Sequence, residues 1–139
     1  MYKKILLASD GSEHSKRAAE NAILIVKCSS NSKIVILYVV DPEKSKSDVL
    51  SNWNSFGIAD IRRERIKEVE SLIKKSGISY EVEFLHGEPG PVIVDYANKN
   101  HFDAVVIGSR GLNALQEFVL GSVSHKVAKH ANCPVMIVK

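Results

Sequence analysis

Two glycine-rich segments in the last third of the chain contain the residues best suited to chemistry. The sequence G-S-R-G at residues 108–111 is followed, after nine residues, by G-S-V-S at residues 121–124. Glycines let the backbone approach a bulky anion, and the first N–H groups of a helix are unpaired and attract negative charge. Serine hydroxyls and the Arg110 guanidinium add further donors. These segments predict a phosphate-binding site without a P-loop lysine, although the same glycines could serve as turn and cap residues.

A second candidate segment, S-D-G-S-E at residues 9–13, follows the first apolar run of the chain. Asp10 or Ser12 can cap the helix that is expected after it, and Gly11 permits a tight turn. Capping alone would explain this segment. Three features nevertheless coincide, namely an acidic turn after one strand, a glycine loop after another, and a glycine-serine pair that opens a helix. Together they indicate one site rather than three unrelated turns.

Five short apolar runs predict the strands that position these segments. Residues 2–8, 34–40, 104–107 and 135–138 are rich in Ile, Val and Leu, as is typical of strands buried on both faces. Residues 80–85 alternate instead and predict a half-exposed strand nearer an edge. Segments with helical spacing lie between the runs, so we expect repeated βαβ units and an open α/β fold. In such sheets, ligands bind beyond the carboxyl ends of the strands, where both candidate segments fall.

One long segment, residues 42–57, shows no regular period and contains four serines. Loops of this length are usually functional or disordered. Trp53 and Phe56 within it are interpreted as anchors to the body of the protein or to a partner subunit, with a cover over a ligand as the alternative.

Length and composition narrow the class of protein. A chain of 139 residues, 45% hydrophobic and 25% charged, predicts a single domain over residues 1–139. The longest apolar run, residues 34–40, is too short to cross a membrane, and no secretory signal is evident, so we expect a cytoplasmic protein. The formal charge of +3 is spread along the chain, which argues against binding to nucleic acid. Cys28 and Cys133 are too few for a disulfide framework, and His130 with Cys133 is interpreted as a helix end rather than a metal site.

The motifs resemble those of one known family. The pattern G-x2-G-x9-G-S, with S-D-G-S after the first strand, V-I-L-Y-V-V-D at the second and C-P-V-M-I-V at the end, is similar to the universal stress proteins. The resemblance covers essentially the whole chain, and the glycine pattern marks the ATP-binding branch. It implies a Rossmann-like, five-stranded parallel sheet in the order 3-2-1-4-5, with helices on both faces. It also implies a homodimer through the last strand, Val135–Val138, whose free edge would otherwise favour aggregation.

The resemblance further implies ATP as the ligand, with Mg²⁺ or Mn²⁺ held through the phosphates. Asp10 would hydrogen-bond the nucleoside and Val39 would supply apolar contact. Arg110 stands where other members carry different polar residues, which leaves its individual role open. The implied nucleotide-binding residues are Ala8, Ser9, Asp10 and Val39 at the adenine and ribose end, Ile107, Gly108, Arg110 and Gly111 beside the ribose and phosphates, and Gly121, Ser122, Val123 and Ser124 along the phosphate chain.

Three functions remain open on the sequence. The first is an ATP-binding regulatory switch in the stress response, in which the nucleotide stabilises one conformation that an unknown protein partner reads. The second is a slow or partner-dependent ATP hydrolase, which would need a group that positions water at the γ-phosphate. His14 and His125 lie near the site segments, but no Walker lysine or nucleophile motif is present, and we assign no catalytic residue. The third is a dimeric interaction module without nucleotide, against which the retained glycine pattern argues.

Overall fold

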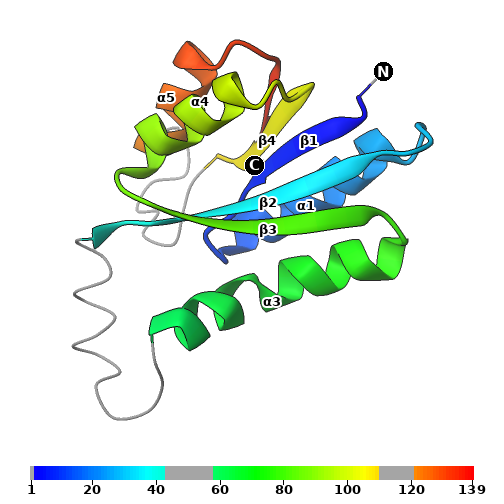
Figure 1. The fold of residues 1–139 in the computed structure, drawn as a ribbon, viewed down its shortest axis with the longest axis horizontal. Coiled ribbons are helices and arrows are strands. Elements are labelled where there is room, and N and C mark those ends of the chain that lie inside the picture. The colour runs from blue at the N-terminus through cyan, green and yellow to red at the C-terminus, as the bar shows by residue number, and fades with distance from the viewer. Residues whose placement is uncertain (1, 43–57, 110–120) are drawn as a thin grey trace.

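The computed structural model describes residues 2–42, 58–109 and 121–139, and its five strands form one parallel sheet in the order β3-β2-β1-β4-β5 (Figure 1). The predicted α/β class and strand order are therefore confirmed. Every strand pair is parallel, and the helices make the crossovers. The described elements are β1 (Lys4–Ala8), α1 (Glu13–Val26), β2 (Lys33–Val40), α3 (Ile58–Ser76), β3 (Ser79–His86), α4 (Pro89–Lys99), β4 (Ala104–Gly108), α5 (Ser122–His130) and β5 (Val135–Val138).

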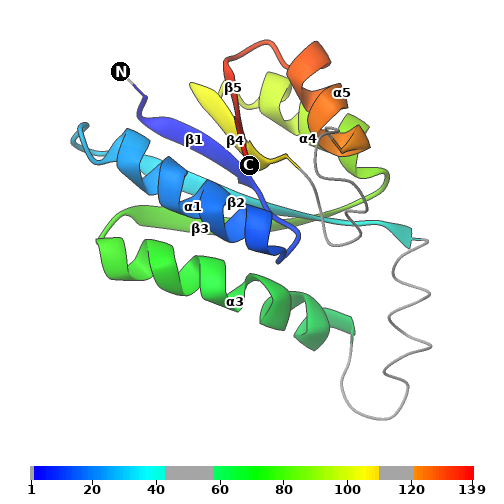
Figure 2. The ribbon, with the colours of Figure 1, turned by 180° about the vertical axis from the view of Figure 1, so that it is seen from behind.

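The sheet separates two apolar cores, because successive side chains of a strand point to opposite faces. In β1, Ile5 and Leu7 join the core that α1 and α3 cover, whereas Leu6 and Ala8 join the core that α4 and α5 cover. Figures 1 and 2 show these helix pairs on opposite sides of the sheet. The near-continuous apolar run of β1 is thus explained by burial on both faces.

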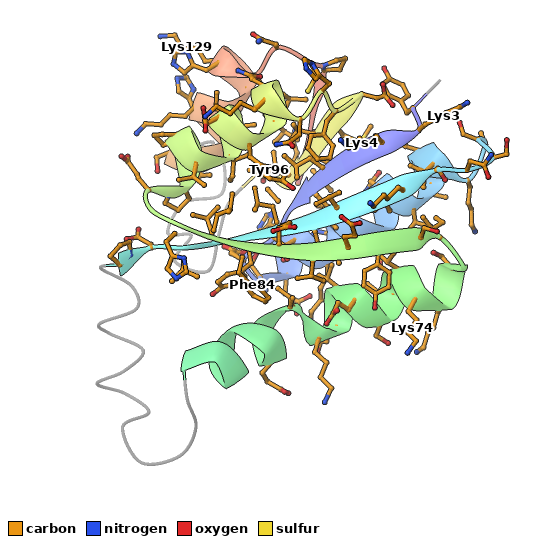
Figure 3. The ribbon with its side chains drawn as sticks, in the orientation of Figure 1. Lys3, Lys4, Lys74, Phe84, Tyr96 and Lys129 are labelled. Carbon is orange, nitrogen blue, oxygen red and sulfur yellow. The ribbon has the colours of Figure 1, made fainter. Side chains whose placement is uncertain are left out.

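The predicted burial agrees with the structure for one edge strand and disagrees for the other. β3 lies at one edge and is largely half-buried, as its alternation predicts, with Val82 and Phe84 packed toward the core near α3. Figure 3 shows Phe84 on the α3 side of the sheet and Tyr96 on the α4 side. The prediction that β5 is buried on both faces is wrong, because β5 forms the other edge and Met136 is 39% exposed. An apolar run indicates that the side chains of a strand are suited to burial. The elements that pack around the strand determine how much of their surface is buried.

Asp103 fastens the start of β1 to the chain before β4. Its Oδ2 atom accepts hydrogen bonds from the backbone N–H groups of Lys4, at 2.8 Å, and Lys3, at 2.9 Å. These bonds stabilise the carboxylate and hold the pKa of Asp103 below its ordinary value. Figure 3 shows both lysines at this end of the sheet.

We expect Asp103→Asn to lower the Tm by about 2–4 °C at pH 7, because the amide oxygen accepts the same bonds without the charge. A carboxyl whose folded pKa is depressed contributes stability above its unfolded pKa and loses it as the pH falls through the folded value. The difference between variant and wild type should therefore shrink below about pH 4. Thermal unfolding at pH 7 and pH 3 measures it, with Asp95→Asn, which removes an exposed pair with Lys99, as the control. An equal difference at both pH values would contradict the assigned cause.

No described helix is long and apolar enough to cross a membrane.

Candidate functional site

The carboxyl ends of β1 and β4 lie side by side. Ala8 pairs with Ile107 across the two strands, and the backbone N–H of Ser9 continues the ladder to β2 by donating to the Leu37 carbonyl at 3.0 Å. Val39 follows two residues later on β2. From this edge the chain passes to α1 on one face after β1, and α5 lies on the other face after β4. Crossovers to opposite faces create the crevice in which open α/β sheets bind ligands.

The segment after β1 is a tight turn that caps α1. The backbone N–H of Ser12 donates to Asp10 Oδ1 at 2.9 Å, and Gly11 adopts a φ of 83°, which favours glycine. Ser12 in turn caps α1, because its Oγ accepts from the Ser15 N–H at 3.3 Å. The capping interpretation is therefore confirmed for Ser12, whereas Asp10 closes the turn that precedes the cap. Asp10 is half-buried beyond the carboxyl end of β1.

The start of α5 is held against the end of β4 through the Ser109 carbonyl. That oxygen accepts hydrogen bonds from the Gly121 N–H at 2.8 Å and the Ser124 Oγ at 2.9 Å. Gly121 is the N-cap of α5 and has no side chain to satisfy the first N–H groups of the helix. These N–H groups are thus placed at the crevice as donors for an anion.

The Ser124 hydroxyl does not have the role expected of a phosphate-binding group. Its side chain is 2% exposed, and Oγ lies within hydrogen-bond distance of the carbonyls of Ser109 and Gly121, at 2.9 and 3.0 Å. A hydroxyl has one proton to donate, and here it faces backbone oxygens. Ser124 therefore positions the first turn of α5 with its side chain, and its main-chain N–H is what it can offer a phosphate.

Packing against α1 leaves no room for a side chain at Gly108. A Cβ built on it would lie 2.7 Å from His14 Cβ and 3.0 Å from the His14 carbonyl carbon, so the first turn of α1 rests directly on β4. His14 Nδ1 also lies 3.3 Å from Ser109 Oγ. Nothing in the sequence signals this contact, because the two residues are far apart along the chain. His14 is thus a structural neighbour of the site.

A cavity of about 210 Å³ adjoins the start of α5. This volume is smaller than that of most small-molecule sites, so it suits part of a ligand rather than all of it. It contains an ion pair, with Lys126 Nζ 2.8 Å from Glu88 Oε1. Glu88 is the N-cap of α4, and Pro89 takes the first helical position. The described lining residues are Asp41, Glu88, Pro89, Gly90, Ser122, Val123 and Lys126.

The structure brings all the described candidate residues to one edge of the sheet. Arg110, Gly111 and residues 43–57 lie outside the described residues. Within the described ranges, no three His, Cys, Asp or Glu side chains gather as they would to hold a metal ion. The residues placed at this edge are Ala8, Ser9, Asp10, Val39, Ile107, Gly108, Gly121, Ser122, Val123 and Ser124.

Comparison with known proteins relates the whole chain to one group. The universal stress protein family model matches residues 1–139. The universal stress protein MJ0531 of Methanocaldococcus jannaschii is 34% identical over 146 residues, which cover 100% of this chain and 83% of the relative.

Solved structures agree with this relationship. The protein MJ0577 superposes with a TM-score of 0.84 at 28% identity, over 100% of this chain and 96% of its own. A universal stress protein in complex with cAMP gives 0.72 at 26% identity, over 99% and 97%. The universal stress protein family protein At3g01520 of Arabidopsis thaliana, with AMP bound, gives 0.70 at 26% identity, over 99% and 91%.

Proposed function

Because this chain belongs to the universal stress protein family, we propose that it binds ATP in the crevice between β1 and β4 and acts as a nucleotide-dependent regulatory switch in the stress response. One observation carries the proposal: the first turn of α5, whose N-cap is a glycine, is held beside the end of β4 by the Ser109 carbonyl. Two relatives of similar structure hold the adenine nucleotides cAMP and AMP, which supports an adenine nucleotide here.

The two ends of the nucleotide would meet different groups of residues. Val39 and Ala8 supply apolar contact for the adenine, and the half-buried Asp10 carboxylate accepts hydrogen bonds from the nucleoside. The first N–H groups of α5 bind the phosphates, helped by the positive end of the helix dipole. Mg²⁺ or Mn²⁺ would be held mainly by phosphate oxygens and water, because such hard cations keep several waters and the described residues offer no cluster of three ligands.

A switch fits the described side chains better than a hydrolase does. The Asp10 carboxylate accepts the Ser12 N–H in the turn before α1, and His14 Nδ1 faces Ser109 Oγ. Two of the side chains that could have acted as a base at the γ-phosphate thus already have structural partners. The nucleotide would instead favour one arrangement of the loops. The proposal includes a homodimer through β5, where Met136 is exposed at the sheet edge. It also includes a protein partner that binds differently to the nucleotide-bound and nucleotide-free forms.

The nucleotide that co-purifies with the protein tests this function. We expect protein that was never given nucleotide to release ATP, near one per subunit, when it is denatured and the supernatant is separated and weighed by mass spectrometry. A tight site with slow turnover keeps its ATP, whereas a competent hydrolase would release ADP or AMP. Empty protein whose Tm does not rise with millimolar Mg-ATP would contradict the proposal and favour an interaction module.

A further inference from the structure

The cavity at the start of α5 contains an ion pair for which the proposed function has no role. Ser122 and Val123 line the cavity from the first turn of α5, and Asp41 lines it from the end of β2. Lys126 and Glu88 face each other across it and join α5 to the residue that precedes α4. A phosphate bound at the first turn of α5 would therefore lie beside this pair.

Lys126 is placed so that its ammonium can reach that phosphate. It follows Ser122 by four residues on α5, so both side chains share one face of the helix, and helical side chains tilt toward the N-terminus. Its stem lies over the first turn of α4, because a Cβ built on Gly90 would approach Lys126 Cδ to 2.8 Å. The side chain is nevertheless 45% exposed. A long lysine stem held at its base leaves the charged end free to turn.

Glu88 holds Lys126 only weakly. Its side chain is 66% exposed, and it makes no capping hydrogen bond to α4 although it occupies the N-cap position. Ion pairs exposed to this degree contribute little to stability. A phosphate chain carries more negative charge than one carboxylate, and it would lie on the helix end to which Lys126 belongs. The ammonium can therefore exchange one anion for the other at low cost.

We propose, on the premise of the proposed nucleotide function, that the Lys126–Glu88 ion pair makes the affinity for a nucleotide depend on the charge of its phosphate chain. Lys126 leaves Glu88 for the phosphate chain, and the Glu88 carboxylate opposes each added phosphate by repulsion, as the neighbouring Asp41 does. The two members of one ion pair thus act in opposite directions on affinity. The same exchange breaks the ion pair that joins α4 and α5. Whether this contact between the two helices is present would then depend on which nucleotide is bound.

Titrations of adenosine, AMP and ATP in the presence of EDTA test this inference, by calorimetry on the wild type and three variants. We expect Lys126→Met to weaken ATP binding about tenfold, AMP binding less, and adenosine binding not at all. Glu88→Gln should strengthen ATP binding about threefold and leave adenosine unchanged. Lys129→Met, which removes an exposed cation from the last turn of α5 (Figure 3), is the matched control and should leave all three affinities unchanged.

The outcomes separate this inference from the function on which it rests. Wild-type protein that has been stripped of co-purified nucleotide and binds none of the three ligands, either in EDTA or with Mg²⁺, overturns both. If the wild type binds ATP, two results overturn only the inference. In the first, the variants change the affinity for adenosine as much as the affinity for ATP. In the second, Lys126→Met and Glu88→Gln change the affinity for ATP in the same direction, as expected of a purely structural pair. Weaker ATP binding by Glu88→Gln would likewise overturn it, since the carboxylate would then contribute to binding.

Discussion

Gly121→Val is expected to weaken ATP binding about a hundredfold or more while the protein stays folded. Gly121 has a φ of −63° and a ψ of 154°, an extended conformation that any residue adopts, so valine causes no backbone strain. Its branched side chain would, however, stand at the N-cap of α5, over the N–H groups proposed to bind phosphate. A hundredfold loss corresponds to about 2.7 kcal/mol of binding free energy. Calorimetric titration with Mg-ATP gives the affinity, and circular dichroism checks the fold.

A glycine substitution away from the crevice serves as the control. Gly77 follows α3 with a φ of 78° and has no atom within 4 Å of a built Cβ. Gly77→Asn therefore meets no clash, and asparagine adopts this left-handed conformation more readily than most residues, at some cost in stability. It should bind ATP as the wild type does. If Gly121→Val binds ATP with unchanged affinity and an intact fold, the phosphates do not lie at the start of α5.

Gly108→Ala is expected to destabilise the protein by about 2 kcal/mol, or about 5–10 °C in Tm, without any nucleotide present. The added methyl would lie 2.7 Å from His14 Cβ and 3.0–3.1 Å from the His14 carbonyl group. Backbone atoms cannot turn aside as a side chain can, so the first turn of α1 must move away from β4. Thermal unfolding of nucleotide-free protein measures the loss.

A double-mutant cycle with His14→Gly identifies the contact. Removing the His14 Cβ relieves the shortest approach, so Gly108→Ala should cost less in the His14→Gly background than in the wild type. The two carbonyl contacts remain, so the relief is partial. Nucleotide-free Gly108→Ala protein with an unchanged Tm would contradict this packing role of Gly108.

The fold class, the strand order and the position of the candidate residues at strand ends could all be predicted from the sequence, the strand order through the family resemblance. These properties follow from local patterns: apolar runs predict buried strands, and Ser12 before Glu13 predicts the start of α1. A local pattern gives no information on which distant residues will pack against a given residue. For that reason the partial burial of β5 and the exposure of Met136 differ from the expectation for an apolar run, although the implied strand order already placed β5 at an edge.

The contacts of the candidate residues depend on long-range packing and could not be predicted from the sequence. Ser124 was expected to offer its hydroxyl to phosphate, but that hydroxyl faces the Ser109 carbonyl. Gly108 packs on His14, and Lys126 pairs with Glu88, across separations of many residues. Such contacts arise when the parallel sheet brings the carboxyl ends of distant strands to one edge. The sequence therefore predicts which residues meet at that edge, and the packing of α1, α4 and α5 decides which of them remain available to a ligand.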